Sequence, residues 1–227
     1  MLHKIDNIPI KTSIEQALNN LHISDSEDIA MVSGLFEMAK KIAKPKALYR
    51  EAYVEEVSGD KTRINGYDFR SAVVTMNLKN IHRVFAYVCT CGTEVDDWSH
   101  KEKDSIVSFW LDMIKQMFLH DAIAFLKDHI KRVFMFEKLS VINPGSGNLE
   151  NWPISQQKPL FDLIGNVKSE IGVTLSGSFL MVPLKSTSGL IFPSETEFVN
   201  CALCSRENCK GRQVPFDIRL YNKAFQN

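Results

Sequence analysis

The chain has 227 residues, of which 44% are hydrophobic and 24% charged, and its 27 basic residues balance its 27 acidic ones. This composition is typical of a soluble globular protein that can bury a core without disulfides. A formal net charge of +0 argues against the basic surface that binds nucleic acids or anionic membranes. We therefore expect a protein or small-molecule partner, and neither nucleic acid nor membrane.

The N-terminal sequence MLHKIDNIPIKTS carries charges and a proline where a signal peptide has a continuous apolar stretch. No uncharged apolar run approaches the roughly 20 residues that span a bilayer. These features predict a cytoplasmic protein.

Two helices are predicted near the N-terminus. Ser13 is a suitable N-cap for the first. The second, capped near Ser24 or Ser26, keeps apolar side chains at helical spacing until Pro45 stops it. Both helices are expected to brace the main body of the protein.

The middle of the chain combines short elements with one long helix. Strands are predicted over 47–57 and 84–89, and a short helix over 71–78. The segment 102–133 has a broad apolar stripe, which is typical of a long helix in the core.

The sequence LSVINPGSG contains the first loop signature. Pro144, Gly145 and Gly147 let the backbone turn sharply and approach a ligand without a Cβ in the way. Asn143 and Ser146 add short polar groups beside those amides. An ordinary tight turn fits the same composition, but the sequence that follows favours a pocket for a small polar ligand.

After this loop, Ser155 can cap a short helix that Gly165 closes. The apolar runs at 171–175 and 179–192 are predicted as strands, and the polar KSTSG segment at 185–189 as a second loop within the latter run. Both loops are expected to line one pocket, because they end elements of the same sheet.

This order of elements resembles the activation domain of cobalamin-dependent methionine synthase and, more closely, the free-standing activation-domain-like proteins of anaerobes. The matching residues are Asn143-Pro144-Gly145-Ser146-Gly147, Trp152-Pro153, Leu160-Phe161, Ile171-Gly172-Val173, Ser178, Met181, Pro183 and Ser186-Thr187-Ser188-Gly189. They cover the middle and C-terminal half of the chain. The resemblance implies binding of S-adenosylmethionine and remethylation of a cobalamin (vitamin B12) cofactor after its oxidation.

We predict an α+β fold with a twisted, mainly antiparallel sheet, a long core helix and N-terminal helices. Its strands are expected near 48–57, 84–89, 139–143, 171–175 and 179–192. A doubly wound parallel sheet is the alternative, but the apolar runs after residue 170 lack intervening helices, which favours antiparallel pairing. Residues 1–45 are expected to form a helical arm packed on the body, and residues 46–227 the activation-domain-like domain.

The resemblance implies a site for S-adenosylmethionine on the two loops and one helix. Its residues are Asn143, Pro144, Gly145, Ser146, Gly147, Lys185, Ser186, Ser188, Gly189 and Asp121. Asp121 is the nearest match to an acidic helix residue of the family's site, although a solvated surface carboxylate is the alternative reading. Val141 and Ser146 stand where the family has an arginine and a tyrosine. Valine cannot offer forked donors to the ligand's carboxylate, and Lys185 is a candidate substitute.

The C-terminal sequence CALCSRENC spaces Cys201, Cys204 and Cys209 as C-x2-C-x4-C. Cytoplasmic thiols stay reduced, so this spacing favours zinc or an iron–sulfur cluster over disulfides. Such centres usually take four ligands. Cys91 is the preferred fourth, since Cys89 ends an apolar strand. Buried cysteines used as small apolar side chains are the alternative.

We consider three functional hypotheses from different classes. The first is an accessory protein that binds S-adenosylmethionine, docks on a corrinoid-binding protein or cobalamin-dependent methyltransferase, and supports reductive methylation of the cobalamin held there. The second is a metal or iron–sulfur redox module that delivers an electron to cob(II)alamin. The third is a non-catalytic interaction subunit of a corrinoid methyltransferase system. None needs a catalytic side chain, and whether the chain is itself an enzyme stays open.

Overall fold

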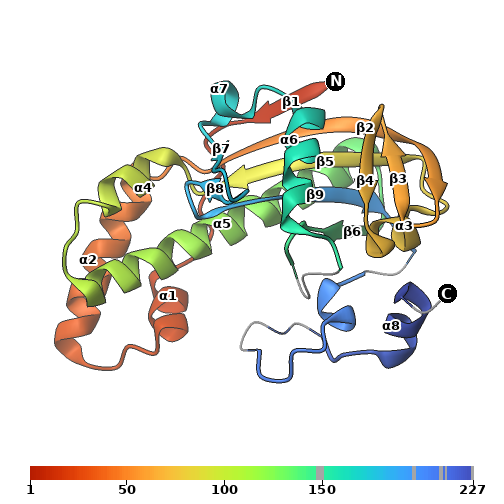
Figure 1. Ribbon diagram of the computed structural model, residues 1–227. Coiled ribbons are helices and arrows are strands. Elements are labelled where there is room, and N and C mark those ends of the chain that lie inside the picture. Colours follow the sequence, from red (N-terminus) through yellow and green to blue (C-terminus); the bar gives the residue numbers. More distant parts are fainter. Residues whose placement is uncertain (147–150, 196–197, 210–211, 213, 226–227) are drawn as a thin grey trace.

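The computed structural model describes residues 1–146, 151–195, 198–209, 212 and 214–225. Within them, a curled sheet of seven strands is crossed by one long helix (Figure 1). The strands are β1 (Leu2–Ile5), β2 (Lys46–Ser58), β3 (Lys61–Ile64), β4 (Tyr67–Arg70), β5 (Arg83–Thr90), β6 (Leu139–Ile142) and β9 (Ser186–Pro193). They lie in the order β4-β3-β2-β5-β9-β6, with β1 paired to β2, and every pair is antiparallel. The predicted α+β class with an antiparallel sheet is confirmed.

Helices cover both faces of the sheet and extend beyond one end of it. They are α1 (Ile14–Leu21), α2 (Ser26–Ile42), α3 (Ala72–Leu78), α4 (Thr93–Ser99), α5 (Ser105–Phe134), α6 (Gln157–Ile164), α7 (Val167–Ile171) and α8 (Ile218–Phe225), with short 3-10 helices η1 (Ile154–Gln156) and η2 (Asn200–Leu203). The helices α1, α2 and α4 gather around the start of α5, while η2 and α8 lie beside the sheet near α3 (Figure 1). The N-terminal strand β1 joins the main sheet by antiparallel pairing with β2.

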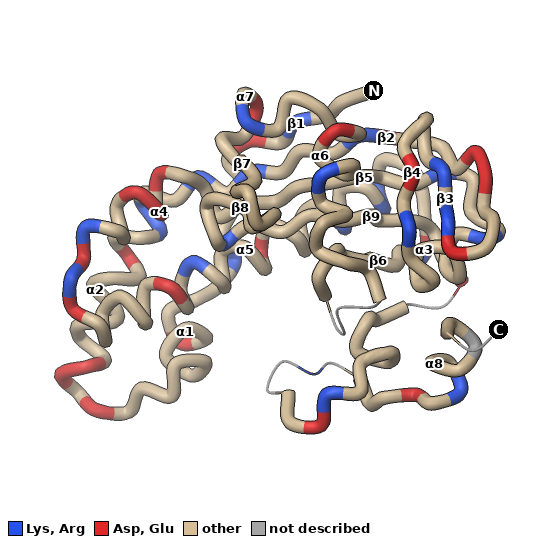
Figure 2. Tube along the Cα trace, in the orientation of Figure 1, with Lys and Arg blue, Asp and Glu red and all other residues tan. Residues whose placement is uncertain are grey.

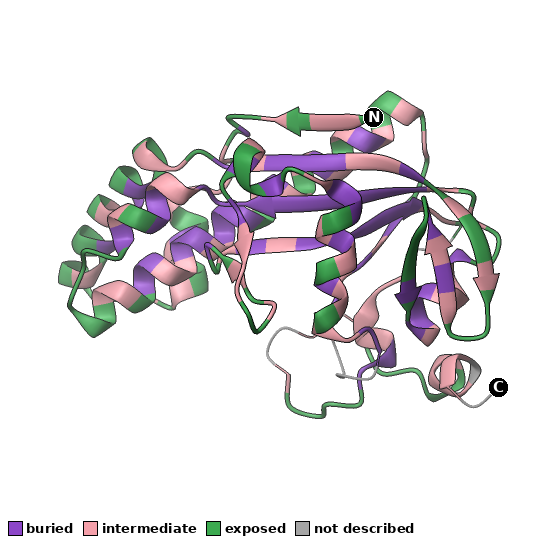
Figure 3. Cartoon of the chain, turned by 45° about the horizontal axis from the view of Figure 1, so that its top comes forward, coloured by how far each residue is buried: buried purple, intermediate pink, exposed green. Residues whose placement is uncertain are grey.

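The central strand β5 separates two apolar cores. Alternate residues Val84, Ala86 and Val88 face the core that includes α3, α6 and α7. Phe85 and Tyr87 face the opposite core, under α5. Because both faces are covered, β5 is a nearly continuous apolar run of buried residues (Figure 3). Because each face of the sheet packs against its own core, the register with β5 determines which core each residue of the neighbouring strands contacts.

Local sequence signals predict most helix boundaries correctly. Ser13 accepts a hydrogen bond from the Gln16 backbone and completes a capping box at α1. Ser71 caps α3 in the same way through the Val74 backbone. Asp25, which lies between the two serines that the sequence suggests, caps α2. The long helix α5 begins and ends close to the predicted 102–133.

Two elements after residue 150 differ from the prediction. The run 171–175 was expected as a strand, but Ile171 ends α7, because Gly172 takes a left-handed conformation with φ of +78°. Only Thr174–Leu175 remains extended, as β7, and it pairs with β8 (Met181–Val182) in a separate hairpin. Ser155 belongs to η1 and makes no capping hydrogen bond there.

The second predicted loop is also wrong, because most of the KSTSG segment lies inside a strand. Ser186 to Gly189 form the first half of β9 and pair with β5, from Thr90↔Ser186 to Tyr87↔Gly189. The segment is polar, yet its backbone hydrogen bonds go to a central strand and its serine side chains have buried partners. Pairing with a distant strand outweighs the local turn-like composition.

Charged residues of both signs are interspersed through all parts of the described chain (Figure 2). None of its described helices combines the length and the apolar character that a bilayer span requires. The distribution of charge therefore does not single out a functional surface.

Candidate functional site

A cavity of about 570 Å³ lies between the second half of α5 and the sheet edge formed by β5, β9 and β6. We call it the α5–β6 cavity. From α5 it receives His120, Ile123, Ala124 and Lys127, whose spacing puts them on one helical face. Its size is within the range of small-molecule sites in proteins.

A segment from the C-terminal part of the chain, residues 198–201, forms another wall of this cavity. Phe198 and Val199, with Asn200 and Cys201 of η2, line it. The Phe198 backbone N–H donates to Ser140 Oγ at 2.8 Å, which attaches the segment to β6. One wall of the cavity is therefore built from residues that are far from the others in sequence.

Asn143 provides an oriented amide at the edge of the cavity. Its Nδ2 donates to the Ser188 carbonyl at 2.7 Å and to the Tyr87 hydroxyl at 2.6 Å. A carbonyl only accepts, so Nδ2 must face Ser188, and Oδ1 points the other way. No described residue donates to that Oδ1 among the hydrogen bonds of the structure. Burial raises the pKa of Tyr87 well above its ordinary value, so the phenol stays neutral.

Gly189 makes room for this amide. It stands opposite Tyr87 in the β5–β9 ladder. A Cβ at Gly189 would collide with the Ile142 carbonyl and come within 2.7 Å of Asn143 Nδ2. The glycine thus permits close approach of the Asn143 side chain, at a position where the resemblance implies a ligand-binding residue.

The alternation of β9 sorts its polar residues between the two faces of the sheet. Thr187 lines the α5–β6 cavity. Ser186 Oγ donates to Thr90 Oγ1 at 3.0 Å, and Ser188 Oγ donates to Gln157 Oε1 at 3.4 Å on the opposite face. Of these three hydroxyls, only that of Thr187 is placed to meet a ligand in this cavity.

The first loop forms a turn, as the sequence predicts. Gly145 has φ of +77°, and its N–H donates to the Trp152 carbonyl at 2.7 Å. Pro144 is buried, while Ser146 lines the cavity. The predicted site residue Gly147 lies outside the described residues.

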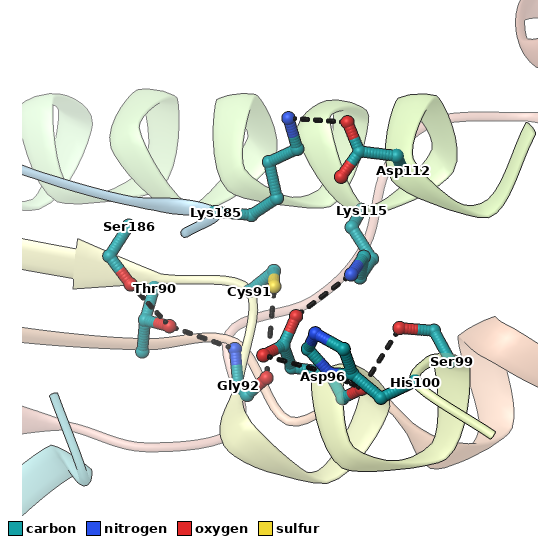
Figure 4. Close-up of polar contacts among 10 residues, drawn as sticks. All are labelled: Thr90, Cys91, Gly92, Asp96, Ser99, His100, Asp112, Lys115, Lys185 and Ser186. Carbon is teal, nitrogen blue, oxygen red and sulfur yellow. Dashed lines mark hydrogen bonds and ion pairs between the residues drawn. The ribbon is translucent and has the colours of Figure 1, made fainter. Parts of the chain in front are cut away.

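Lys185 and Asp121 are occupied by other contacts. Figure 4 shows Lys185 reaching Asp112 of α5, with 2.7 Å between Nζ and Oδ2. Asp121 Oδ2 accepts from the Lys11 backbone at 3.0 Å and from the Thr12 backbone and hydroxyl, both at 2.9 Å. Asp121 lines a neighbouring cavity of about 460 Å³ that shares His120 with the α5–β6 cavity. Its carboxylate holds the N-terminal segment against α5.

The cysteines do not form the expected ligand set in the described part of the chain. Cys91 is buried, and burial raises the pKa of its thiol to about 12, so it does not ionise near neutral pH. Arg212 donates to the carbonyls of Cys201 and Cys204, both at 3.2 Å, and to that of Arg206. Among the described residues, no group of three or more His, Cys, Asp or Glu side chains is placed to hold a metal ion. The backbone carbonyls of this loop therefore bind the Arg212 guanidinium. The described cysteine thiols are not gathered into a metal-binding group.

A curled antiparallel sheet, a long helix across it and a cavity between the two define an activation-domain-like α+β fold. The structure is similar to a crystal structure described as "the MetH Reactivation Domain bound to AdoHcy", with a TM-score of 0.60 and 13% sequence identity. The match covers 88% of this chain and 81% of that one. No family model and no curated protein matches the sequence. At this identity the likeness shows the fold, and at that level the resemblance expected from the sequence is confirmed.

Several cavity residues were not singled out from the sequence. Tyr87 was interpreted only as part of a buried strand, and Thr187 only as part of a loop. Reading the KSTSG segment as a strand would have separated Thr187 from its neighbouring serines by the period of two. His120 and Lys127 share a face of α5, but nothing in the sequence shows that this face meets a cavity.

Proposed function

We propose that the protein binds S-adenosylmethionine in the α5–β6 cavity and supports reductive methylation of a corrinoid cofactor held by a partner protein. One observation carries the proposal. Asn143 and Ser146, which belong to the stretch that resembles the activation domain, line a single cavity of about 570 Å³ together with Val141, which stands where the family has an arginine. The similar solved domain, whose description names AdoHcy as its ligand, supports the choice of an S-adenosyl compound.

The role of this chain would be to hold and orient the ligand. Methyl transfer breaks the bond between the sulfonium and its methyl group and releases S-adenosylhomocysteine. The corrinoid on the partner protein would accept an electron from an external one-electron reductant and would then supply the nucleophile that takes the methyl group. Asn143 and Thr187 offer polar contacts, and the apolar side chains of Ile123 and Phe198 limit the entry of water. Positioning of this kind needs no side-chain acid or base.

Calorimetric titration with S-adenosylmethionine and S-adenosylhomocysteine tests the binding site. Ala124 is exposed and lines the cavity, so Ala124→Trp should fill it without disturbing the core. We expect affinity to fall by at least about tenfold. Val133→Trp, at an exposed position in the last turn of α5, is the matched control and should bind like wild type. Equal affinity in both variants would move the ligand to another site.

The partner step is tested with the corrinoid-binding module of a cobalamin-dependent methionine synthase, a chemical reductant and S-adenosylmethionine. Release of S-adenosylhomocysteine should require all components together with this protein. Wild-type protein that binds neither S-adenosyl compound would contradict the proposal and favour the third hypothesis, an interaction subunit without ligand chemistry.

A further inference from the structure

The amino-acid end of S-adenosylmethionine carries a carboxylate, and a carboxylate that leaves water needs a cation or several donors. Val141, on the strand that borders the α5–β6 cavity, has no polar side-chain atom to offer. Lys185, suggested by the sequence, is not among the described residues that line the cavity. The anchor for the carboxylate has to come from another element.

Lys127 is placed for this task. Among the described residues that line the α5–β6 cavity, it is the one lysine or arginine. It lies one turn after Ala124 on the face of α5 that meets the cavity, and its side chain is partly exposed. Val141 lines the same cavity from the sheet side.

We infer that the Lys127 ammonium binds the carboxylate at the amino-acid end of the ligand, an inference that rests on the proposed function. Asn143 complements it, because its outward Oδ1 is an acceptor suited to the ligand's neighbouring ammonium group. Lys127 thereby determines specificity for S-adenosyl compounds that carry an intact amino-acid group. It touches no reacting atom and takes no part in the methyl transfer.

Decarboxylated S-adenosylmethionine, which lacks only the carboxylate, separates this role from a general packing role. We expect Lys127→Met to weaken binding of S-adenosylmethionine by about 10- to 100-fold, the range for a hydrogen bond to a charged group. Binding of the decarboxylated compound should change by less than about threefold. This compound has no carboxylate for Lys127 to bind, and methionine preserves the packing of the aliphatic part of the lysine side chain. Lys131→Met, one turn further along α5 and outside the described cavity lining, is the matched control and should bind both compounds like wild type.

Lys127→Arg keeps the positive charge and should retain the preference for the compound with a carboxylate. Equal weakening of both compounds in Lys127→Met, or unchanged affinity for both, would overturn the inference while the proposed function stands. Wild-type protein that binds neither compound would remove the proposed function and this inference with it. Thermal unfolding of each variant, compared with wild type, shows that the differences do not come from misfolding.

Discussion

In the first half of α5, Asp112 and Lys115 have charged partners, with 2.7 Å to Lys185 and 2.8 Å to Asp96 (Figure 4). In the second half, His120, Ala124 and Lys127 line the α5–β6 cavity. The Lys115 and Asp96 side chains are both 8% exposed, so that pair is almost completely buried. The comparison shows that one helix has a structural end, joined to neighbouring segments by ion pairs, and a cavity end, which borders the α5–β6 cavity.

Asp96 makes further polar contacts at the structural end. Asp96 also contacts His100 at 3.5 Å, and the Ser99 hydroxyl donates to the Asp96 carbonyl at 2.9 Å. They order α4 around Asp96, and the Lys115–Asp96 pair connects α4 to α5. Substitutions there should change stability, whereas substitutions at the cavity end should change ligand affinity.

Lys115→Met should have the largest effect on stability. It leaves the buried Asp96 carboxylate without its main partner, which costs about 3–5 kcal/mol. Denaturation with urea measures the loss. Lys185→Met is the comparison, because its pair with Asp112 is partly exposed and should contribute about 1 kcal/mol or less. Similar losses in the two variants would mean that the Lys115 pair is not shielded from water.

Gly145→Val should have the next largest effect, and it should change both stability and ligand affinity. Valine is strained at φ of +77°, by about 1–2 kcal/mol, and its Cβ would lie 3.3 Å from Ile154. The displaced loop should abolish S-adenosylmethionine binding in protein that remains folded, whereas Val141→Arg should keep or strengthen binding.

Gly177→Val is the control for the glycine substitution, because a Cβ at Gly177 meets no atom within 4 Å. It should change neither stability nor affinity appreciably. Unchanged ligand affinity in folded Gly145→Val would exclude the first loop from the binding site.

Thiol labelling perturbs the protein least. It shows which cysteines are accessible in the folded state. Cys201 and Cys209 are partly exposed and should react with iodoacetamide in the native state. Cys89 and Cys91 are buried, burial raises the pKa of both thiols, and they should react only after unfolding. Peptide mass spectrometry before and after denaturation measures each site.

Metal analysis of anaerobically purified protein completes that experiment. From the described geometry we expect less than one equivalent of zinc or iron. A full equivalent that disappears in Cys204→Ser would instead support the metal hypothesis and, if the protein is brown, the redox module.

The sequence by itself determined the features that depend on neighbours along the chain. The stripe of α5, the capping box at Ser13 and the cap at Ser71 are local patterns, and the structure contains all three. The antiparallel class was also predictable, because consecutive apolar runs without helices between them cannot form parallel pairs easily. The turn at Gly145 follows from the freedom of glycine at positive φ.

Only the tertiary structure decided which polar residues meet the cavity. Lys127 and Lys185 look alike in sequence, but β9 brings Lys185 against Asp112, whereas Lys127 lines the α5–β6 cavity. Ser186 and Ser188 look like loop residues, but pairing with β5 turns them toward the face opposite Thr187. The physical reason is that the partners come from distant segments, and their contacts form only when the sheet and α5 pack together.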